Sequence, residues 1–155
     1  MLLKKGGVFL LSSYFEELHV GERWISRART ITETDLVMFA AFSGDWYQLH
    51  TDREWAAKTQ FGQRIAHGLL VLSVASGFMD LSQGRVIAFY GLDHVRFTGP
   101  TFIGDTIHME LEVIEKKEKG PDRGLVKFKQ EIKNQRDEVV AVAELLMLMA
   151  RKPAD

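Results

Sequence analysis

The sequence predicts an α+β fold in which an antiparallel sheet wraps around a central apolar helix. The first half of the chain carries helix-capping patterns and helical spacing, whereas the second half alternates apolar and polar residues with a period of two. Between them, the segment from Ala66 to about Leu81 is apolar on nearly every face, which is typical of a buried helix. An apolar helix followed by antiparallel strands is buried most economically when the sheet curls around it.

Composition restricts the class of protein. The 155 residues suffice for one domain with one core. Hydrophobic residues make up 46% and charged residues 26%, which indicates a folded globular chain and not a disordered one. The net charge is −1 and the basic residues are scattered, so we expect neither a nucleic acid nor a membrane as partner. Cysteine is absent, which excludes disulfides, zinc–thiolate sites and a thiol nucleophile, and fits the expected cytoplasmic location.

Domain organisation is predicted to be simple. Residues 1–13 are expected to form a loosely attached N-terminal extension, and residues 14–151 a single domain. The apolar stretch Val8 to Leu11 is shorter than the roughly 7–15 residues of a secretory signal. The longest apolar run, Gly68 to Met79, falls short of the about 18 residues that a membrane span needs.

Three helices are expected in the first half. Thr32 is the predicted N-cap of the first helix, which Gly44 ends. The pattern Thr51-Asp52-Arg53-Glu54 predicts a second, short helix that stops near Gly62. The third is the apolar helix described above.

Five strands are expected, and turn sequences separate the last four. In one of them Val126, Phe128, Gln130 and Ile132 alternate with charged residues, which predicts one buried and one wet face. The expected strands are a first one around Gly21–Ile31 and then Val86–Thr98, Thr106–Lys116, Leu125–Asn134 and Val139–Ala150. Sheet and helix together predict the hot-dog architecture. The long final strands would leave an exposed edge, so we expect a homodimer with a continuous sheet, or a higher oligomer of such dimers.

Asp45 and His50 are the first candidates for chemistry. They stand five residues apart in a segment expected to be a loop between two helices. A carboxylate and an imidazole can hold a water between them and move its proton. Spacing alone leaves a structural role open, because an Asp after Gly44 can form a turn and a His beside Thr51 can begin a helix.

The second candidate segment is the start of the apolar helix at His67 and Gly68. Free backbone N–H groups at a helix N-terminus can stabilise a developing oxyanion. Gly68 also allows a close approach to the backbone, which would equally serve tight packing of helix on sheet. His67 could bind substrate or satisfy a backbone group. Hydration of a 2-enoyl thioester needs a base, a proton source and donors to an enolate oxygen, and the two segments together can supply all three.

Both segments resemble a known signature. Asp45-Trp46-Tyr47-Gln48-Leu49-His50-Thr51-Asp52, followed by Phe61-Gly62-Gln63-Arg64-Ile65-Ala66-His67-Gly68-Leu69, resembles the motifs of MaoC-like hydratases, which include the R-specific enoyl-CoA hydratases. Gly99-Pro100-Thr101-Phe102-Ile103-Gly104-Asp105-Thr106 resembles that family's conserved turn.

This resemblance implies Asp45 and His50 as the catalytic pair and Gly68 as the backbone donor to the thioester carbonyl. Ser76 matches a position that lines the site in the R-specific enzymes, although it could equally be a small residue chosen for packing. The implied reaction is the reversible hydration of a trans-2-enoyl-CoA to an (R)-3-hydroxyacyl-CoA, with coenzyme A entering only as substrate and no cofactor.

The chain departs from the family at Tyr47 and Gln48, where Asn-Pro is usual. Proline's rigidity is lost, and Tyr47 either donates a hydrogen bond to substrate or reshapes the acyl pocket.

Two other functions compete with hydration. A thioesterase of the same fold often carries an acid within the central helix, but Gly68 to Met79 contains none. A non-catalytic acyl-CoA-binding protein would not require both Asp45 and His50.

Metal and phosphate sites receive little support from spacing. His19, His94 and His108 lack ligand spacing, so no metal is expected. Arg64, Arg85 and Arg96 could meet coenzyme A phosphates or have structural roles.

Overall fold

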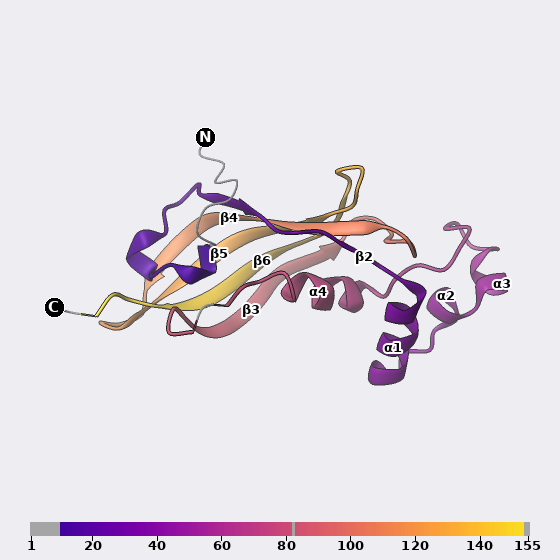
Figure 1. Cartoon of the computed structure of the whole chain (residues 1–155), viewed down its shortest axis with the longest axis horizontal. Coiled ribbons are helices and arrows are strands. Elements are labelled where there is room, and N and C mark those ends of the chain that lie inside the picture. Colours follow the sequence, from indigo (N-terminus) through magenta and orange to yellow (C-terminus); the bar gives the residue numbers. More distant parts are fainter. Residues whose placement is uncertain (1–9, 82, 154–155) are drawn as a thin grey trace.

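The computed structural model describes residues 10–81 and 83–153. Its main element is an antiparallel sheet in the order β1-β4-β5-β6-β3, with the short strand β2 also paired to β4. The strands are β1 Arg23–Ile25, β2 Arg29–Thr30, β3 Val86–Phe97, β4 Thr106–Glu118, β5 Arg123–Lys133 and β6 Val139–Ala150. The four long strands agree with the predicted ones to within two residues at each end. The sheet is long and curved, with α4 against one face (Figure 1).

The first predicted strand is wrong in one respect, because it is divided into β1 and β2. Between them, the Ser26 hydroxyl accepts a hydrogen bond from the backbone N–H of Met109 at 2.8 Å. The Ser26 N–H still donates to the Met109 carbonyl oxygen at 2.9 Å, but the return bond goes to the Ser26 side chain, and regular pairing stops there.

The first helix, α1 (Glu33–Ser43), has the predicted ends. The Thr32 hydroxyl accepts from the Asp35 N–H, and the Asp35 carboxylate accepts from the Thr32 N–H, which completes a capping box. Gly44 ends the helix in the left-handed conformation at φ 77°.

The second predicted helix consists of two short helices, α2 (Gln48–Thr51) and α3 (Arg53–Ala56). Within the predicted capping pattern, the N-cap of α3 is Asp52 and not Thr51. Asp52 caps α3 by accepting from the Trp55 N–H, whereas the Thr51 hydroxyl donates back to the Trp46 carbonyl. Asp competes well for the cap position because its carboxylate is charged and short.

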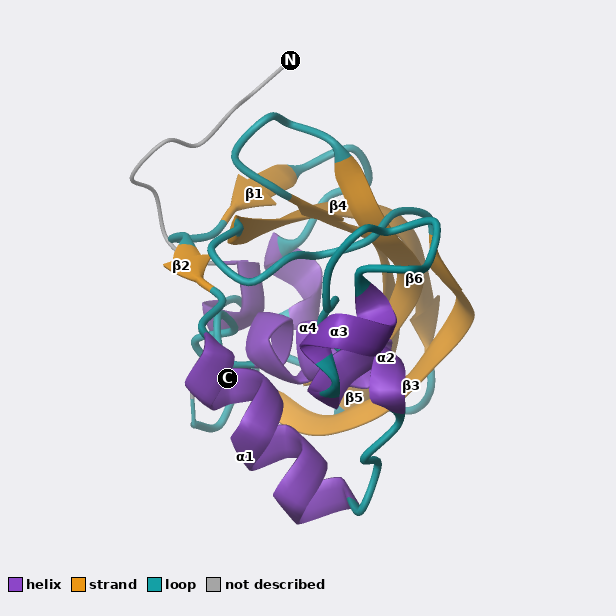
Figure 2. Ribbon diagram, turned by 90° about the vertical axis from the view of Figure 1, so that its right-hand side faces the viewer, coloured by secondary structure: helices purple, strands orange, loops and turns teal. Residues whose placement is uncertain are grey.

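The apolar helix, α4 (Gly68–Ser76), is shorter than predicted and only half buried. Leu70, Val71 and Ala75 lie in the core, but Leu69 is 63% exposed and the Ser73 and Ser76 side of the helix also faces outward. The expectation of a helix buried on every face is therefore wrong for the single chain. Figure 2, the view from the end that carries α1, α2 and α3, shows the sheet curving around one side of α4.

The N-terminal segment is better attached than predicted. Residues 1–9 lie outside the described part of the chain, but Leu10 and Leu11 are 4% and 0% exposed in the core. They belong to a 3-10 helix, Leu10–Ser12, and a second one, Phe15–Glu17, follows. The core therefore extends upstream of the expected boundary at residue 14.

The exposed edge of the sheet is β3 and not the final strand, which lies between β5 and β3. The pairing of β3 with β6 has three register shifts, between Val86 and Ala88, Phe89 and Gly91, and Asp93 and Arg96. Large apolar side chains on β3 are exposed, namely Ile87, Phe89, Tyr90 and Phe97. Within residues 10–81 and 83–153, the structure has no helix of the length and apolarity that crossing a membrane requires.

Candidate active site

Asp45 is held by the turn that follows α1. Its backbone N–H donates to the Ser43 hydroxyl at 3.2 Å, and its Oδ1 accepts from the Tyr47 N–H at 3.2 Å. This local turn is one that Asp favours. The side chain is exposed, so the carboxylate can meet a small molecule.

His50 lies in α2 and not in a loop, and its ring is fixed by a distant segment. Nδ1 lies 2.8 Å from the carbonyl oxygen of Ile65. Because a carbonyl only accepts hydrogen bonds, Nδ1 carries the proton in the neutral ring, and Nε2 keeps its lone pair. His50 therefore presents a proton acceptor at Nε2.

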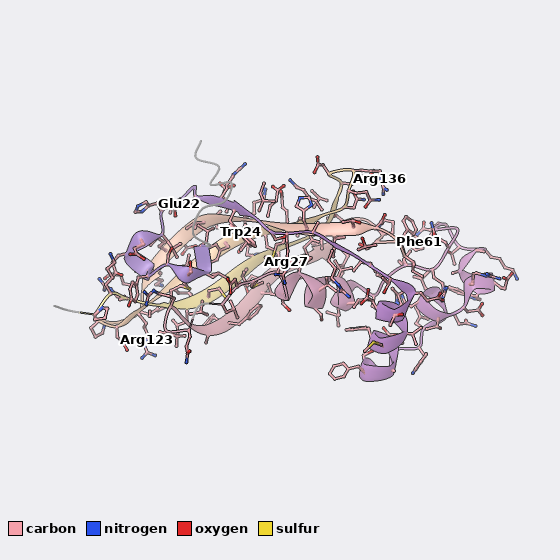
Figure 3. The ribbon with its side chains drawn as sticks, in the orientation of Figure 1. Glu22, Trp24, Arg27, Phe61, Arg123 and Arg136 are labelled. Carbon is pink, nitrogen blue, oxygen red and sulfur yellow. The ribbon has the colours of Figure 1, made fainter. Side chains whose placement is uncertain are left out.

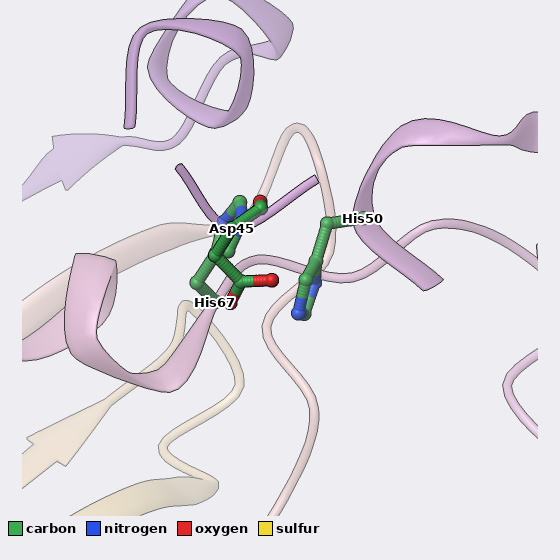
Figure 4. Close-up of side chains that lie close together, drawn as sticks. All are labelled: Asp45, His50 and His67. Carbon is green, nitrogen blue, oxygen red and sulfur yellow. The ribbon is translucent and has the colours of Figure 1, made fainter. Parts of the chain in front are cut away.

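The buried His67 contacts both Asp45 and His50. It is 2% exposed, its Nε2 donates to the Asp45 carbonyl oxygen at 3.0 Å, and its ring stacks on that of His50 with centroids 3.8 Å apart (Figure 4). Burial lowers the pKa of His67, against the opposing effect of its hydrogen bond to Asp45, so the ring stays neutral. His67 thus forms a hydrogen bond with a backbone group, which is the structural role that the sequence left open for it.

The three side chains form a compact cluster. One ligand-type atom from each of Asp45, His50 and His67 lies within 4.8 Å of the others, and His67 Nδ1 has no partner among the described residues. The cluster can hold one water, and its ligand types also suit a zinc ion. His67 lies 17 residues from His50 in the sequence, so no local ligand spacing indicates this set.

A small cavity opens beside His50. Its volume is about 130 Å³, and Gly68, Val71, Phe97 and Val140 contribute to its wall. A side chain at Gly68 would place its Cβ 2.6 to 2.8 Å from three atoms of the Phe97 ring, so the close approach that Gly68 allows is that of Phe97. No described residue accepts a hydrogen bond from the Gly68 N–H. This donor at the start of α4 is therefore open to a ligand.

Tyr47 and Gln48 keep the backbone that the usual Asn-Pro would require. Tyr47 has φ −56° and ψ 135°, the extended conformation that a following proline needs, and Gln48 is the first residue of α2, where proline is favoured. The Tyr47 ring packs edge-on against Trp55 at 5.6 Å and lies 6.0 Å from the His50 ring. Tyr47 thus forms a wall near the pair.

Ser76 is not brought to this cavity. It lies about two helical turns beyond Gly68, and its hydroxyl donates to the Ser73 carbonyl oxygen at 2.6 Å. The structure therefore assembles Asp45, His50, His67, Gly68 and Tyr47, and leaves Ser76 apart in the single chain. Sequence reasoning missed Phe97, which no local pattern connects to Gly68.

Comparisons with known proteins identify the family of the chain. A family model described as "MaoC like domain" matches residues 17–135. Protein MaoC of Klebsiella aerogenes is 43% identical over 99 residues, which cover 63% of this chain and 30% of that protein. A 3-hydroxybutyryl-CoA dehydratase of Methylorubrum extorquens is 36% identical over 66% of this chain and 64% of its own length. This chain therefore spans less than two thirds of both relatives.

Solved structures extend the likeness over most of the chain. A protein from Archaeoglobus fulgidus described as a monoamine oxidase regulatory protein has a TM-score of 0.86 and 45% identity, covering 91% of this chain and 96% of that one. The R-hydratase PhaJ1 from Pseudomonas aeruginosa has a TM-score of 0.72 and 35% identity, covering 90% and 86%. A Mycobacterium tuberculosis protein with a double hotdog fold has a TM-score of 0.82 at 22% identity, over 96% and 47%. The predicted hot-dog fold is confirmed.

Proposed function

Because the chain belongs to the MaoC-like domain family, a family of hydratases and dehydratases, we propose that it adds water reversibly to a trans-2-enoyl-CoA and forms an (R)-3-hydroxyacyl-CoA. One observation carries this proposal. Asp45 and His50 present a carboxylate and an imidazole Nε2 together, next to a cavity whose wall includes the open N–H of Gly68.

His50 and Asp45 divide the work on the water. The water donates one proton toward His50 Nε2 and its other hydrogen toward the Asp45 carboxylate, which orients it. The hydroxide adds to the β-carbon, and the protonated His50 returns its proton to the α-carbon, so one water is added in total. The Asp45 carboxylate stabilises the positive imidazolium in between, and the neutral His67 adds no opposing charge.

Gly68 acts on the thioester carbonyl of the substrate, whereas Asp45 and His50 act on the water. As water adds, negative charge develops on the thioester oxygen, and the N–H at the start of α4 can donate a hydrogen bond to that oxygen. The acyl chain enters the cavity beside Phe97. A volume of about 130 Å³ corresponds to about four water molecules, so a short acyl group such as crotonyl has room there.

The competing functions have weaker support. Helix α4 contains no Asp or Glu, which disfavours a thioesterase that places its acid there. A non-catalytic acyl-CoA-binding protein does not account for the hydrogen bonds that orient Asp45 and His50 toward a shared point.

The test follows the absorbance of the enoyl thioester with crotonyl-CoA. Wild type is expected to remove the band while mass spectrometry shows an intact thioester with one water added. Asp45→Asn is expected to lower kcat about 100-fold or more, since a positioned acid–base group contributes about 10²–10⁴. Asp80→Asn, the same change at an exposed carboxylate beyond α4, serves as the matched control and should match wild type. Release of free coenzyme A would instead identify a thioesterase, and binding without turnover would identify a carrier protein.

We also propose that two copies pair through β3. This strand is one edge of the sheet, and it exposes Tyr90 at 63% and Phe97 at 50%. Leu69 of α4 is also 63% exposed. Such a long apolar edge is normally covered.

Light scattering tests the dimer. Wild type is expected to have twice the mass of the chain, and Tyr90→Lys to shift toward the single chain. Val20→Lys changes a similarly exposed apolar residue away from β3 and should leave the mass unchanged. A wild-type monomer at micromolar concentration would refute the pairing.

A further inference from the structure

Both histidines of the candidate site keep one unprotonated ring nitrogen. His50 donates through Nδ1 to the carbonyl oxygen of Ile65 at 2.8 Å, and His67 donates through Nε2 to the carbonyl oxygen of Asp45 at 3.0 Å. The other nitrogen of each neutral ring, Nε2 of His50 and Nδ1 of His67, therefore carries a lone pair. The proposed hydration uses Nε2 of His50 and assigns no task to Nδ1 of His67.

The Nδ1 atom of His67 is a buried acceptor without a donor. His67 is 2% exposed, and this nitrogen has no hydrogen-bond partner among residues 10–81 and 83–153. Burying an acceptor that lacks a partner is unfavourable, and such groups are rare in folded proteins. We therefore expect this lone pair to meet a hydrogen-bond donor or a cation.

The composition of the cluster is that of a metal site. Asp45, His50 and His67 each bring one ligand-type atom within 4.8 Å of the others. Two neutral imidazoles and one carboxylate form a ligand set that zinc binds, with its fourth position left to water. Magnesium and calcium ions prefer oxygen ligands alone, so this set favours zinc over them.

The hydrogen bonds behind the two rings support the same reading. A histidine that binds a metal usually donates its second N–H to a carboxylate or a backbone carbonyl, which fixes its tautomer and its direction. His50 and His67 both donate to backbone carbonyls in this way. Aromatic rings border the cluster, since Phe39 lies 4.9 Å from the ring of His67 and Tyr47 lies 6.0 Å from that of His50.

Zinc binding requires an adjustment of the two accessible ligands. A tetrahedral ion about 2.0–2.1 Å from each ligand needs ligand atoms about 3.3 Å apart, so a separation of 4.8 Å has to close by about 1.5 Å. The stacked rings of His50 and His67 are inclined by 27°, so one ring also has to tilt until both lone pairs point at the ion. Asp45 is exposed and His50 is half-buried in the four-residue helix α2, so these two move toward the buried His67.

We propose that Asp45, His50 and His67 bind one Zn²⁺ ion, and that the bound ion stops hydration. The inhibition rests on the proposed function, whereas the binding does not. The ion coordinates Nε2 of His50, which then cannot accept a proton from water, and it holds the Asp45 carboxylate that orients the water. Zinc is therefore a reversible inhibitor at the catalytic pair.

Calorimetry with Zn²⁺ in the absence of substrate tests the site. Wild type is expected to bind one Zn²⁺ per chain and no Mg²⁺ at the same concentration. His67→Gln keeps a donor for the Asp45 carbonyl but removes the imidazole. It should raise the Kd for Zn²⁺ at least about tenfold, because loss of a group that merely supports a ligand already costs about 10–100-fold. Asp45→Asn changes an exposed side chain, should weaken binding likewise, and decides the question if His67→Gln does not fold.

His19→Gln is the matched control. His19 is exposed, and its backbone N–H donates to the carboxylate of Glu22. Figure 3 labels Glu22 toward one end of the molecule and Phe61, which follows α3, toward the other. This variant should bind Zn²⁺ as wild type does. An equal loss in His19→Gln, or an unchanged Kd in either folded cluster variant, would show that zinc binds surface imidazoles and would overturn the site.

Hydration of crotonyl-CoA tests the inhibition. Protein freed of metal with EDTA is expected to be active, and its rate should fall in proportion to the zinc occupancy measured by calorimetry. Removing the ion with EDTA should restore the rate. His19→Gln should be inhibited like wild type, whereas His67→Gln, compared with its own zinc-free rate, should need at least about tenfold more zinc.

The outcomes separate the two proposals. An unchanged rate at full zinc occupancy, or activity that appears only with zinc, overturns the inhibition. If zinc does not bind one-to-one but crotonyl-CoA is hydrated, the metal site is refuted and the hydratase stands. If the protein hydrates no thioester with or without zinc, the proposed function fails, and the calorimetry of the variants then decides the metal site alone.

Discussion

Replacing Gly68 with alanine puts a methyl group where the Phe97 ring now lies. The added Cβ would stand 2.6 to 2.8 Å from three ring atoms, so the ring must move. The far end of a phenylalanine is a flexible group, and Phe97 is already 50% exposed, so we expect it to rotate away without unfolding the domain.

The two effects on stability nearly cancel. Burying a whole Phe side chain contributes about 1.5–3 kcal/mol, so displacing a half-buried ring costs roughly 1 kcal/mol. Replacing a glycine with alanine at a position whose backbone alanine can adopt gains about 0.4–1 kcal/mol, because the unfolded chain has fewer conformations to lose. The free energy of unfolding of Gly68→Ala should therefore stay within about 1 kcal/mol of wild type, measured by urea denaturation.

Activity should respond far more strongly than stability. The methyl group and the displaced ring crowd the N–H that receives the thioester oxygen, and loss of one such donor costs about 10²–10³ in kcat. Adding Phe97→Leu to Gly68→Ala frees the space and should recover part of kcat/KM for crotonyl-CoA. If Gly68→Ala alone retains kcat/KM within about threefold of wild type, the assignment of Gly68 as the oxyanion donor is wrong.

Three further predictions concern α1, α2 and the contact between the two ends of the described chain. Gln48→Pro should leave activity intact and stabilise the fold by about 0.4–1 kcal/mol in urea, because the backbone already has the proline conformation; a loss of stability would contradict the assigned start of α2. Thr32→Ala should cost about 0.5–2 kcal/mol through loss of the α1 cap, whereas Thr32→Ser should cost little. Burial opposes ionisation of Glu16, but hydrogen bonds from Arg151 and Lys152 outweigh it and lower its pKa to about 2. Its unfolded pKa is near 4.5, so this stabilising contribution is present above that value and is lost as the pH falls toward 2. Glu16→Gln should flatten the decline of stability in that window, and an unchanged pH profile would argue against the contact.

Local patterns predicted the long strands well. Val126, Phe128 and Ile132 are each at most 1% exposed, because a period of two in the sequence translates directly into one face of a strand. The capping box at Thr32 was equally predictable, since all its atoms come from four consecutive residues.

Features that depend on distant partners escaped prediction. Nothing near Ser26 in sequence indicates that its hydroxyl takes a ladder bond from Met109, so one strand was expected where there are two. The uniform apolarity of α4 gave no sign that Leu69 would be uncovered in a single chain. The exposed edge was expected at the final strands because strand order cannot be read from strand periodicity.

In the candidate site, too, the locally encoded features were predicted and the contacts between distant residues were not. Asp45 and His50 were recognised from a short segment and a family signature. The stacking of His67 on His50 and its hydrogen bond to the Asp45 carbonyl join residues 17 and 22 positions apart. Such contacts arise from the packing of elements, which no local pattern encodes.

The three register shifts along β3 bear on which chains this protein can pair with. A straight, regular edge offers evenly spaced N–H and C=O groups to any extended peptide and invites indiscriminate fibrous association. Each shift in β3 interrupts that spacing, and at His94 the backbone turns to a φ of 52°. An extended peptide that pairs with β3 would find only short stretches in register. The edge through which we propose that two copies pair therefore resists extension by unrelated strands, because its irregular backbone interrupts the ladder on which fibrous association depends.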